Sequence, residues 1–292
     1  MHVGKVSGSE ALSNVSSAFV GQIEAQLMIK PYVPTMTKSE LLASMSGSLA
    51  CIAGGVMAVY IGLGIPAEYL LTASIMAMPG ALVISKLVYP ETEKSETAET
   101  ISLEVKKNHV NLIDAIAHGA SDGMRISINV IAMLIGFIAL IAMINAILGK
   151  FGLWIHNLTG WETVLGMTLS SLSLKSILGA IFSIFAFLMG VPFHEASQVG
   201  ALMGTKLVVN EFVGYIDLLE MIKMGLSQKS VVIASFALCG FANLGSIAIQ
   251  IGGIGEIAPN RKEDLAKLGV KALICGTLAS YMSAAIAGII CG

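Results

Sequence analysis

The chain has 292 residues, of which 55% are hydrophobic and 12% are charged, and its net charge is −2. A soluble globular domain carries about 25% charged residues, so this composition is typical of a polytopic membrane protein. The small negative charge excludes a basic surface for nucleic acid. The four cysteines form no CxxC pair, so the sequence indicates neither a zinc site nor a disulfide framework.

The first expected element is a re-entrant helical hairpin over residues 9–33. This stretch is too polar to face lipid and too apolar for water, and a polar cluster breaks it near its middle. Irregular backbone is tolerated at membrane depth only inside protein or beside a wet cavity. Residues 41–67 and 69–85 follow as two membrane spans, because a helix needs about 20 apolar residues to cross the hydrocarbon core.

The middle of the chain predicts a charged segment and one scaffold span. Residues 86–125 indicate a solvent loop followed by an amphipathic helix near the membrane surface, and residues 126–149 are uncharged and aliphatic. Asp114, His118 and Asp122 lie at helical spacing and are interpreted as a solvated face rather than as metal ligands. Residues 177–191 are apolar but short, which indicates an interfacial or re-entrant helix.

The last third predicts a second hairpin over residues 194–219, with Asn210 and Glu211 at its break, and then spans over 231–254 and 272–291. FANLGS (241–246) lies inside the first of these spans, and the glycines around it predict unwound backbone. A helix-packing face of small residues is the alternative interpretation. An odd number of crossings separates the two hairpin–span–span units, so the second would be inverted, as in many secondary transporters.

The predicted fold is therefore an all-α membrane protein. An inverted repeat of a re-entrant hairpin plus two transmembrane helices is joined by an amphipathic segment and one scaffold helix. The predicted domains are residues 1–88 (first transport-domain repeat), 89–175 (amphipathic segment, scaffold helix and linker) and 176–292 (second repeat). With the first hairpin on the cytoplasmic side, twelve Lys and Arg residues lie inside and four outside, which obeys the positive-inside rule.

Two glutamates, Glu24 and Glu211, are expected to be buried at bilayer depth, where a charged group costs roughly 2.5–3.5 kcal/mol. Carboxylates accept hydrogen bonds from hydroxyl and N–H groups, and nearby amides both donate and accept. The amides are Gln22, Asn210 and Asn243. Such groups suit a neutral polar solute such as a sugar or a nucleoside, whereas an anion would need Arg or Lys and only Lys206 is near. Alternatively, the glutamates only cap the hairpin tips.

Several stretches, occurring in order, resemble the concentrative nucleoside transporter family over essentially the whole chain. They are GQIEAQL, LLTASIMAMPGALVISKLVYPETE, MGVPFHEASQVGALMGTKLVVNEF, FALCGFANLGSIAIQIGGIG and GTLASYMSAAIAGI. The family's N-terminal scaffold helices are missing, which leaves a fragment or a misassigned start as explanations. The resemblance implies a homotrimer in which each protomer has a scaffold and a mobile transport domain.

The resemblance also implies a nucleoside site between the two hairpins and the two broken helices. Gln22 and Glu24 would contact the nucleobase, and Glu211, with Asn243 and Ser246, would hold the ribose. The remaining implied contacts are Val56 and Phe241, which are apolar, and Ile23, which replaces the Thr or Ser frequent in the family. The lost hydroxyl at residue 23 leaves the base preference open.

A coupling-ion site is implied at five residues: Ser17, Val20, Cys51, Ile52 and Glu24. Sodium-coupled members carry an Asn where this chain has Ser17, and a Ser hydroxyl where it has Cys51. Na⁺ prefers hard oxygen ligands, for which a thiol is a poor substitute. The pattern therefore favours proton over sodium coupling, with Glu24 as the proton carrier, although the carbonyls of Val20 and Ile52 could still bind sodium.

The sequence predicts a cation-coupled nucleoside symporter of the bacterial inner membrane. It would not be an enzyme, and it would need no cofactor beyond the coupling ion, H⁺ or Na⁺. Its expected partners are a nucleoside, the lipid bilayer and copies of itself, without nucleic acid. Three alternatives stay open: a symporter for another neutral polar metabolite, a fragment that does not transport, and an intramembrane hydrolase using Glu24 and Glu211. The hydrolase lacks a recognisable nucleophile or metal ligands.

Overall fold

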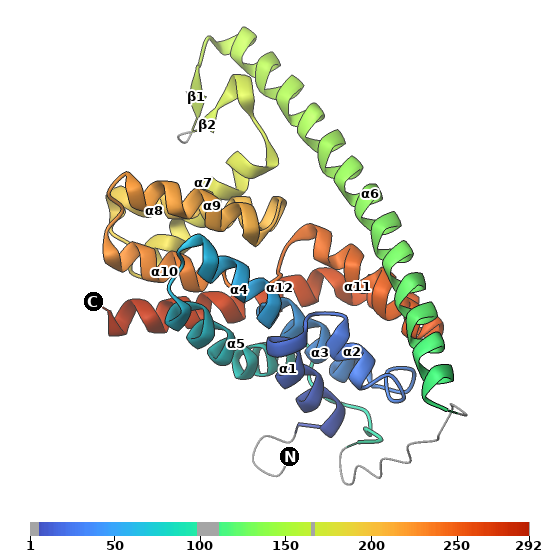
Figure 1. The fold of residues 1–292 in the computed structure, drawn as a ribbon. Helices are drawn as coiled ribbons and strands as arrows, with labels where there is room; N and C mark the ends of the chain where they lie inside the picture. The colour runs from blue at the N-terminus through green and yellow to red at the C-terminus, as the bar shows by residue number, and fades with distance from the viewer. Residues whose placement is uncertain (1–5, 98–110, 165–166, 292) are drawn as a thin grey trace.

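The computed structural model describes residues 6–97, 111–164 and 167–291. It is almost entirely helical (Figure 1). The exception is a short antiparallel strand pair, β1 (Thr163–Val164) and β2 (Met167–Thr168). Within the described residues, four helical stretches are long and apolar enough to cross a membrane, and they are Lys38–Leu63, Ala67–Val88, Leu112–Thr159 and Pro259–Ile290. The predicted α-helical, multi-pass architecture is confirmed.

The first hairpin consists of α1 (Gly8–Val20) and the short α2 (Glu24–Met28). α1 begins with a capping box in which Ser7 and Glu10 bond each other's backbone N–H groups. It ends at Gly21, whose φ of 123° favours glycine. Buried polar side chains hold the hairpin against the next helix, since Gln26 accepts a bond from Ser44 (2.8 Å) and donates one to Ser48 (2.9 Å).

The first predicted span is a broken helix, α3 (Lys38–Ala50) followed by α4 (Gly54–Leu63). The chain is unwound between them, at residues 51–53. α5 (Ala67–Val88) then forms one continuous helix, although it contains Pro79. These elements agree with the expected order of hairpin, span and span.

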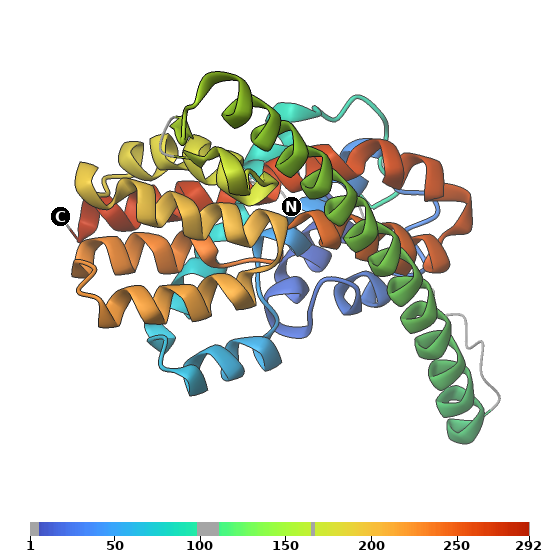
Figure 2. The same ribbon diagram turned by 90° about the horizontal axis from the view of Figure 1, so that it is seen from above.

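A single helix of 48 residues, α6 (Leu112–Thr159), contains both the amphipathic segment and the scaffold span. The sequence predicted two separate helices, but the structure has one continuous helix. No proline between residues 112 and 159 interrupts its backbone hydrogen bonds. Figure 1 shows α6 along the outside of the other helices, and Figure 2 shows its N-terminal part projecting beyond them. The preceding loop was expected partly over residues 98–110, which lie outside the described residues.

The second half begins with a 3₁₀ turn, η1 (Leu169–Ser171), and α7 (Leu174–Leu188), which matches the short apolar helix expected from the sequence. The second hairpin follows as α8 (Phe193–Val208) and α9 (Glu211–Lys223). α7 packs closely on α8. A Cβ atom added at Gly200 of α8 would lie only 2.4 Å from the backbone nitrogen of Ser183 in α7.

The expected span over 231–254 is also broken, into α10 (Gln228–Leu238) and α11 (Leu244–Ile257). The unwound backbone covers residues 239–243, so the prediction for FANLGS is confirmed at 241–243, whereas residues 244–246 already form the first turn of α11. A 3₁₀ turn, η2 (Pro259–Arg261), leads into the long final helix α12 (Lys262–Ile290). Hairpin, broken helix and continuous helix thus occur in the same order in α1–α5 and in α8–α12.

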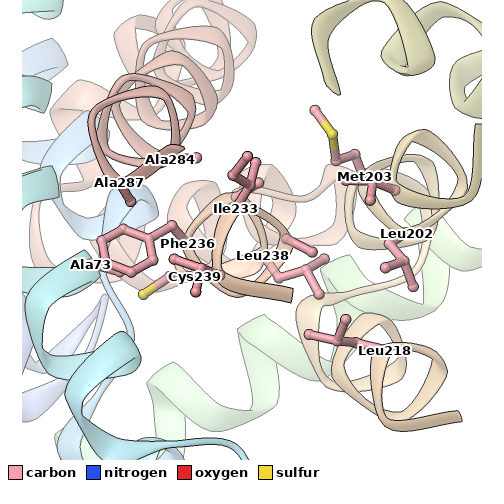
Figure 3. Packing of buried hydrophobic residues seen from close by; sticks show 14 of the residues in the cluster. Ala73, Leu202, Met203, Leu218, Ile233, Phe236, Leu238, Cys239, Ala284 and Ala287 are labelled. Carbon is pink, nitrogen blue, oxygen red and sulfur yellow. The ribbon is translucent and has the colours of Figure 1, made fainter. Parts of the chain in front are cut away.

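α10 lies at the centre of the largest hydrophobic core. Figure 3 shows Ile233, Phe236 and Leu238 of α10 between side chains of α8 and α9 on one side and of α5 and α12 on the other. All residues from Ser230 to Leu238 are buried. A helix without an exposed polar face is typical of a protein core. α10 is therefore packed on both sides up to Leu238, where the chain unwinds.

Candidate functional site

The two unwound segments touch each other at the centre of the molecule. The backbone N–H of Phe241, in the second break, donates to the carbonyl of Cys51, in the first break (3.2 Å). Gly240 has a φ of 107°, and a Cβ there would lie 2.5 Å from the carbonyl oxygen of Ala50. Glycine is therefore required for this close approach, and the contact fixes where the side chains after each break point.

Glu211 is the buried carboxylate of the site, with 6% of its surface exposed. It is the first residue of α9, whose N-cap Asn210 accepts the N–H of Val213 (2.9 Å). One carboxylate oxygen accepts the Tyr60 hydroxyl (3.1 Å), and the other accepts the amide of Asn243 (3.3 Å). Side chains from hairpin 2 and from both broken helices therefore meet at one carboxylate.

Asn243 has a second role as the N-cap of α11. Its side-chain oxygen accepts the N–H of Ser246 (2.8 Å), while its amide nitrogen donates to Glu211. The cap satisfies one of the N–H groups that a helix start leaves unpaired. It also fixes the amide, so that the donor towards Glu211 has one defined direction.

Glu211, Asn243 and Ser246 line a first cavity of about 650 Å³. This volume lies in the usual range for a small-molecule site, about 300–1,000 Å³. Gln22 and Phe241 also line it, and an apolar wall comes from α6, including Phe137 and Ile141. A polar carboxylate–amide side thus faces an apolar side.

A second cavity of about 470 Å³ adjoins the first, and the two share Gln22, Phe241 and Ile249. The second cavity is lined by Ile23, Glu24 and Val56 from the first repeat and by residues 123–130 of α6. Gln22 thus lies where the cavities meet, and no described residue hydrogen-bonds to its buried side-chain oxygen.

All eight residues implied as substrate contacts therefore line one or both cavities. They are Gln22, Ile23, Glu24, Val56, Glu211, Phe241, Asn243 and Ser246. The Ile23 side chain also packs against α11. A Cβ atom added at Gly253 of α11 would lie only 2.6 Å from Ile23 Cδ1. Neither cavity is lined by Lys or Arg within the described residues, so the site has no cationic group for an anion.

The expectation that Glu24 is buried was wrong. Glu24 begins the five-residue helix α2 and is exposed at the hairpin tip. Its carboxylate folds back over Gly21 and accepts the N–H of Ile23 (3.3 Å). Glu24 lines the second cavity from an accessible position.

The Ser17 and Cys51 side chains, both implied for the coupling ion, hydrogen-bond to different neighbours. The Ser17 hydroxyl donates to the carbonyl of Ser13 (2.6 Å) and lies 3.0 Å from the Ser48 hydroxyl. The Cys51 thiol donates instead to the carbonyl of Ser74 (3.6 Å). Val20 lines the second cavity, whereas Ile52 is fully buried. Among the described residues, no cluster of three or more His, Cys, Asp or Glu side chains could hold a metal ion.

Sequence reasoning missed two polar residues of the site, Tyr60 of α4 and Asn145 of α6. Tyr60 is fully buried in an apolar helix, and its ring packs on Tyr215 with centroids 4.6 Å apart. Asn145 lines the first cavity and accepts the backbone N–H of Leu174 (2.9 Å). An Asn near the end of an aliphatic span was a usable signal, but nothing distinguished Tyr60 from an ordinary core aromatic.

Residues 69–288 match the family model described as "Na+ dependent nucleoside transporter C-terminus". The chain belongs to the concentrative nucleoside transporter family. Among the family's curated proteins, the "Uncharacterized transporter YutK" of Bacillus subtilis is 48% identical over 97% of this chain and 67% of its own length. The "Nucleoside permease NupC" of Helicobacter pylori is 42% identical over 98% of this chain and 66% of its own length.

Solved structures of a concentrative nucleoside transporter, CNTnw, have the same fold. CNTnw in an inward-facing, substrate-bound state is 45% identical, with a TM-score of 0.75 over 97% of this chain and 65% of CNTnw. A variant of CNTnw in an outward-facing state gives a TM-score of 0.84 with the same identity and coverage. The chain spans about two thirds of the length of these relatives. Membership of this family of nucleoside transporters also means that the chain is not an enzyme.

Proposed function

We propose that the chain carries the substrate site of a nucleoside symporter that imports nucleosides across the bacterial cytoplasmic membrane. The main evidence is the position of the Glu211 carboxylate. It accepts hydrogen bonds from Tyr60 and Asn243 and lines a cavity that has no Lys or Arg among its lining residues. A carboxylate with free lone pairs binds hydroxyl groups such as those of a ribose. The relatives named for nucleoside transport support the same substrate class.

The two adjoining cavities suggest how the nucleoside divides between them. The ribose would lie in the first cavity, against Glu211, Asn243 and Ser246. The base would lie towards Gln22 and Glu24 in the second cavity, between the apolar side chains of Val56 and Phe241. Gln22 supports this division, because its unpaired buried oxygen lies at the junction.

The proposed coupling ion is a proton rather than sodium. A thiol at residue 51 is a poor sodium ligand, and the Ser17 and Cys51 side chains already bond to separate neighbours. Glu24, at the accessible hairpin tip, is the proposed proton carrier. Closing the cavity around both ion and nucleoside would couple their movement.

The proposed architecture around this site is an inverted repeat in a homotrimer. Residues 1–88 and 176–292 would form the mobile transport domain, and residues 89–175 would contribute the scaffold helix. The repeated order of elements in α1–α5 and α8–α12 supports the internal repeat. The charge distribution supports opposite orientations of the two copies.

The test is uptake of labelled nucleosides into proteoliposomes with an imposed proton or sodium gradient. It should be run on the 292-residue chain and on a version extended upstream. We expect uridine or adenosine uptake that a protonophore abolishes and that sodium does not change. Sodium-dependent uptake at fixed pH would overturn proton coupling. Uptake of another polar metabolite, but of no nucleoside, would overturn the proposed substrate.

A further inference from the structure

Lys206 is a fully buried lysine that neither cavity uses. It lies in the last turn of α8, just before the tip of hairpin 2, and it has no exposed surface. It is absent from the residues that line the two cavities. A buried ammonium is unfavourable unless polar groups surround it, so its partners indicate what it does.

The ammonium of Lys206 binds the end of the broken helix α10. It donates to the carbonyls of Ala237 (2.9 Å) and Cys239 (3.0 Å), at the point where α10 stops and the chain unwinds towards Asn243. The last carbonyls of a helix have no partner within the helix and carry its negative dipole end. In transporters with broken helices, such carbonyls are where free cations bind.

The described part of the first repeat shows no lysine bonded to its break. Its broken helix unwinds after Ala50, and the carbonyl of Cys51 accepts the backbone N–H of Phe241. Among the hydrogen bonds of the described residues, none joins a Lys or Arg side chain to residues 49–53. The two breaks therefore differ, since one holds a covalently attached cation and the other does not.

We propose that Lys206 is a tethered cation, which occupies the carbonyls of the second break and keeps a free cation from binding there. This inference rests on the proposed function. By holding the end of α10, Lys206 fixes the start of the segment that carries Phe241 and Asn243 into the first cavity. It is thus a positioning residue for nucleoside binding, acting through Cys239 and the residues that follow it.

The test compares three substitutions of Lys206 in the full-length protein, reconstituted in proteoliposomes. Lys206→Arg keeps the charge, Lys206→Gln keeps an N–H donor without charge, and Lys206→Met keeps only the length. The matched control is Lys223→Met, which removes an exposed lysine from the other arm of the same hairpin. Thermal melting in detergent monitors folding, and equilibrium nucleoside binding accompanies the KM and kcat of uptake.

We expect the Gln and Met variants to raise the nucleoside KM about tenfold, because the two charge-assisted bonds that position the second break are weakened or lost. Lys206→Arg and the Lys223 control should keep the KM of the unsubstituted protein. The Gln and Met variants should also become sensitive to added Na⁺, since a free cation can then bind the Ala237 carbonyl and the Cys239 carbonyl, which also accepts the Ser280 hydroxyl (2.8 Å). If the Met variant fails to fold, the Gln variant decides.

A Gln variant with unchanged KM and unchanged cation dependence would overturn the inference, because a neutral donor would then suffice. That result leaves the proposed function intact. Absence of nucleoside uptake by the unsubstituted full-length protein is a different result, and it would overturn the proposed function itself.

Discussion

Replacing Glu211 with Gln removes the charge of the first cavity while keeping its shape. The two carboxylate oxygens accept bonds from Tyr60 and Asn243. A Gln side chain can turn its oxygen towards the Asn243 amide and its NH₂ towards the Tyr60 hydroxyl, which can accept as well as donate. Neither neighbour loses its partner, so Glu211→Gln should fold and assemble normally.

The expected loss lies in the contact with the substrate. A hydrogen bond to a charged group contributes about 1.5–3 kcal/mol. Since each 1.4 kcal/mol changes a binding constant tenfold, one lost ribose bond should weaken nucleoside binding by about 10- to 150-fold. The KM of uptake should rise with the dissociation constant, because the substitution affects binding before transport.

A cycle of protein and ligand changes isolates this bond. Binding of uridine and of its 2′-deoxy and 3′-deoxy analogues is measured for the unsubstituted protein and for Glu211→Gln. We expect the unsubstituted protein to discriminate strongly against at least one deoxy analogue, and Glu211→Gln to lose most of that discrimination. If both proteins discriminate equally, Glu211 does not contact a ribose hydroxyl and serves only to cap hairpin 2.

Two further substitutions test the surroundings of the carboxylate. Tyr60→Phe keeps the ring contacts with Tyr215 and Phe212 but removes the bond to Glu211, so nucleoside affinity should fall about tenfold with little change in melting temperature; unchanged affinity would show that Tyr60 does not orient the carboxylate. Gly240→Ala forces a side chain into a positive-φ position against the carbonyl of Ala50, so stability should fall by at least about 1–2 kcal/mol. A thermal melt equal to that of the unsubstituted protein would contradict the described contact between the two breaks.

The hairpins and the second break were predictable because their signals are local, whereas the first break was expected only from the family resemblance. Gln22, Asn210 and the glycines around Phe241 interrupt apolar stretches at the positions where the helices end. Polar residues and glycine within an apolar run either break a helix or face a cavity, so each local pattern left few alternatives. The repeated order of elements then followed from reading these interruptions along the chain.

What could not be predicted depends on contacts between distant segments. Tyr60 and Glu211 are 151 residues apart in the sequence, and the apolar residues around Tyr60 give no indication of the hydrogen bond between them. Glu24 was expected to be buried because it lies within an otherwise apolar stretch, but whether a side chain at a hairpin tip is covered depends on segments far away in the sequence. The carbonyls that hold Lys206 belong to a helix end whose position relative to α8 is set only by the folded core.

The length of α6 has a consequence for how it lies in the bilayer. Its 48 residues span about 72 Å, more than twice the roughly 30 Å of the hydrocarbon core. The charged Asp122, which is bonded to Lys30, favours water over hydrocarbon, so the first turns of α6 belong outside the core. The 37 residues that follow Asp122 are still long enough to cross the bilayer at a slant.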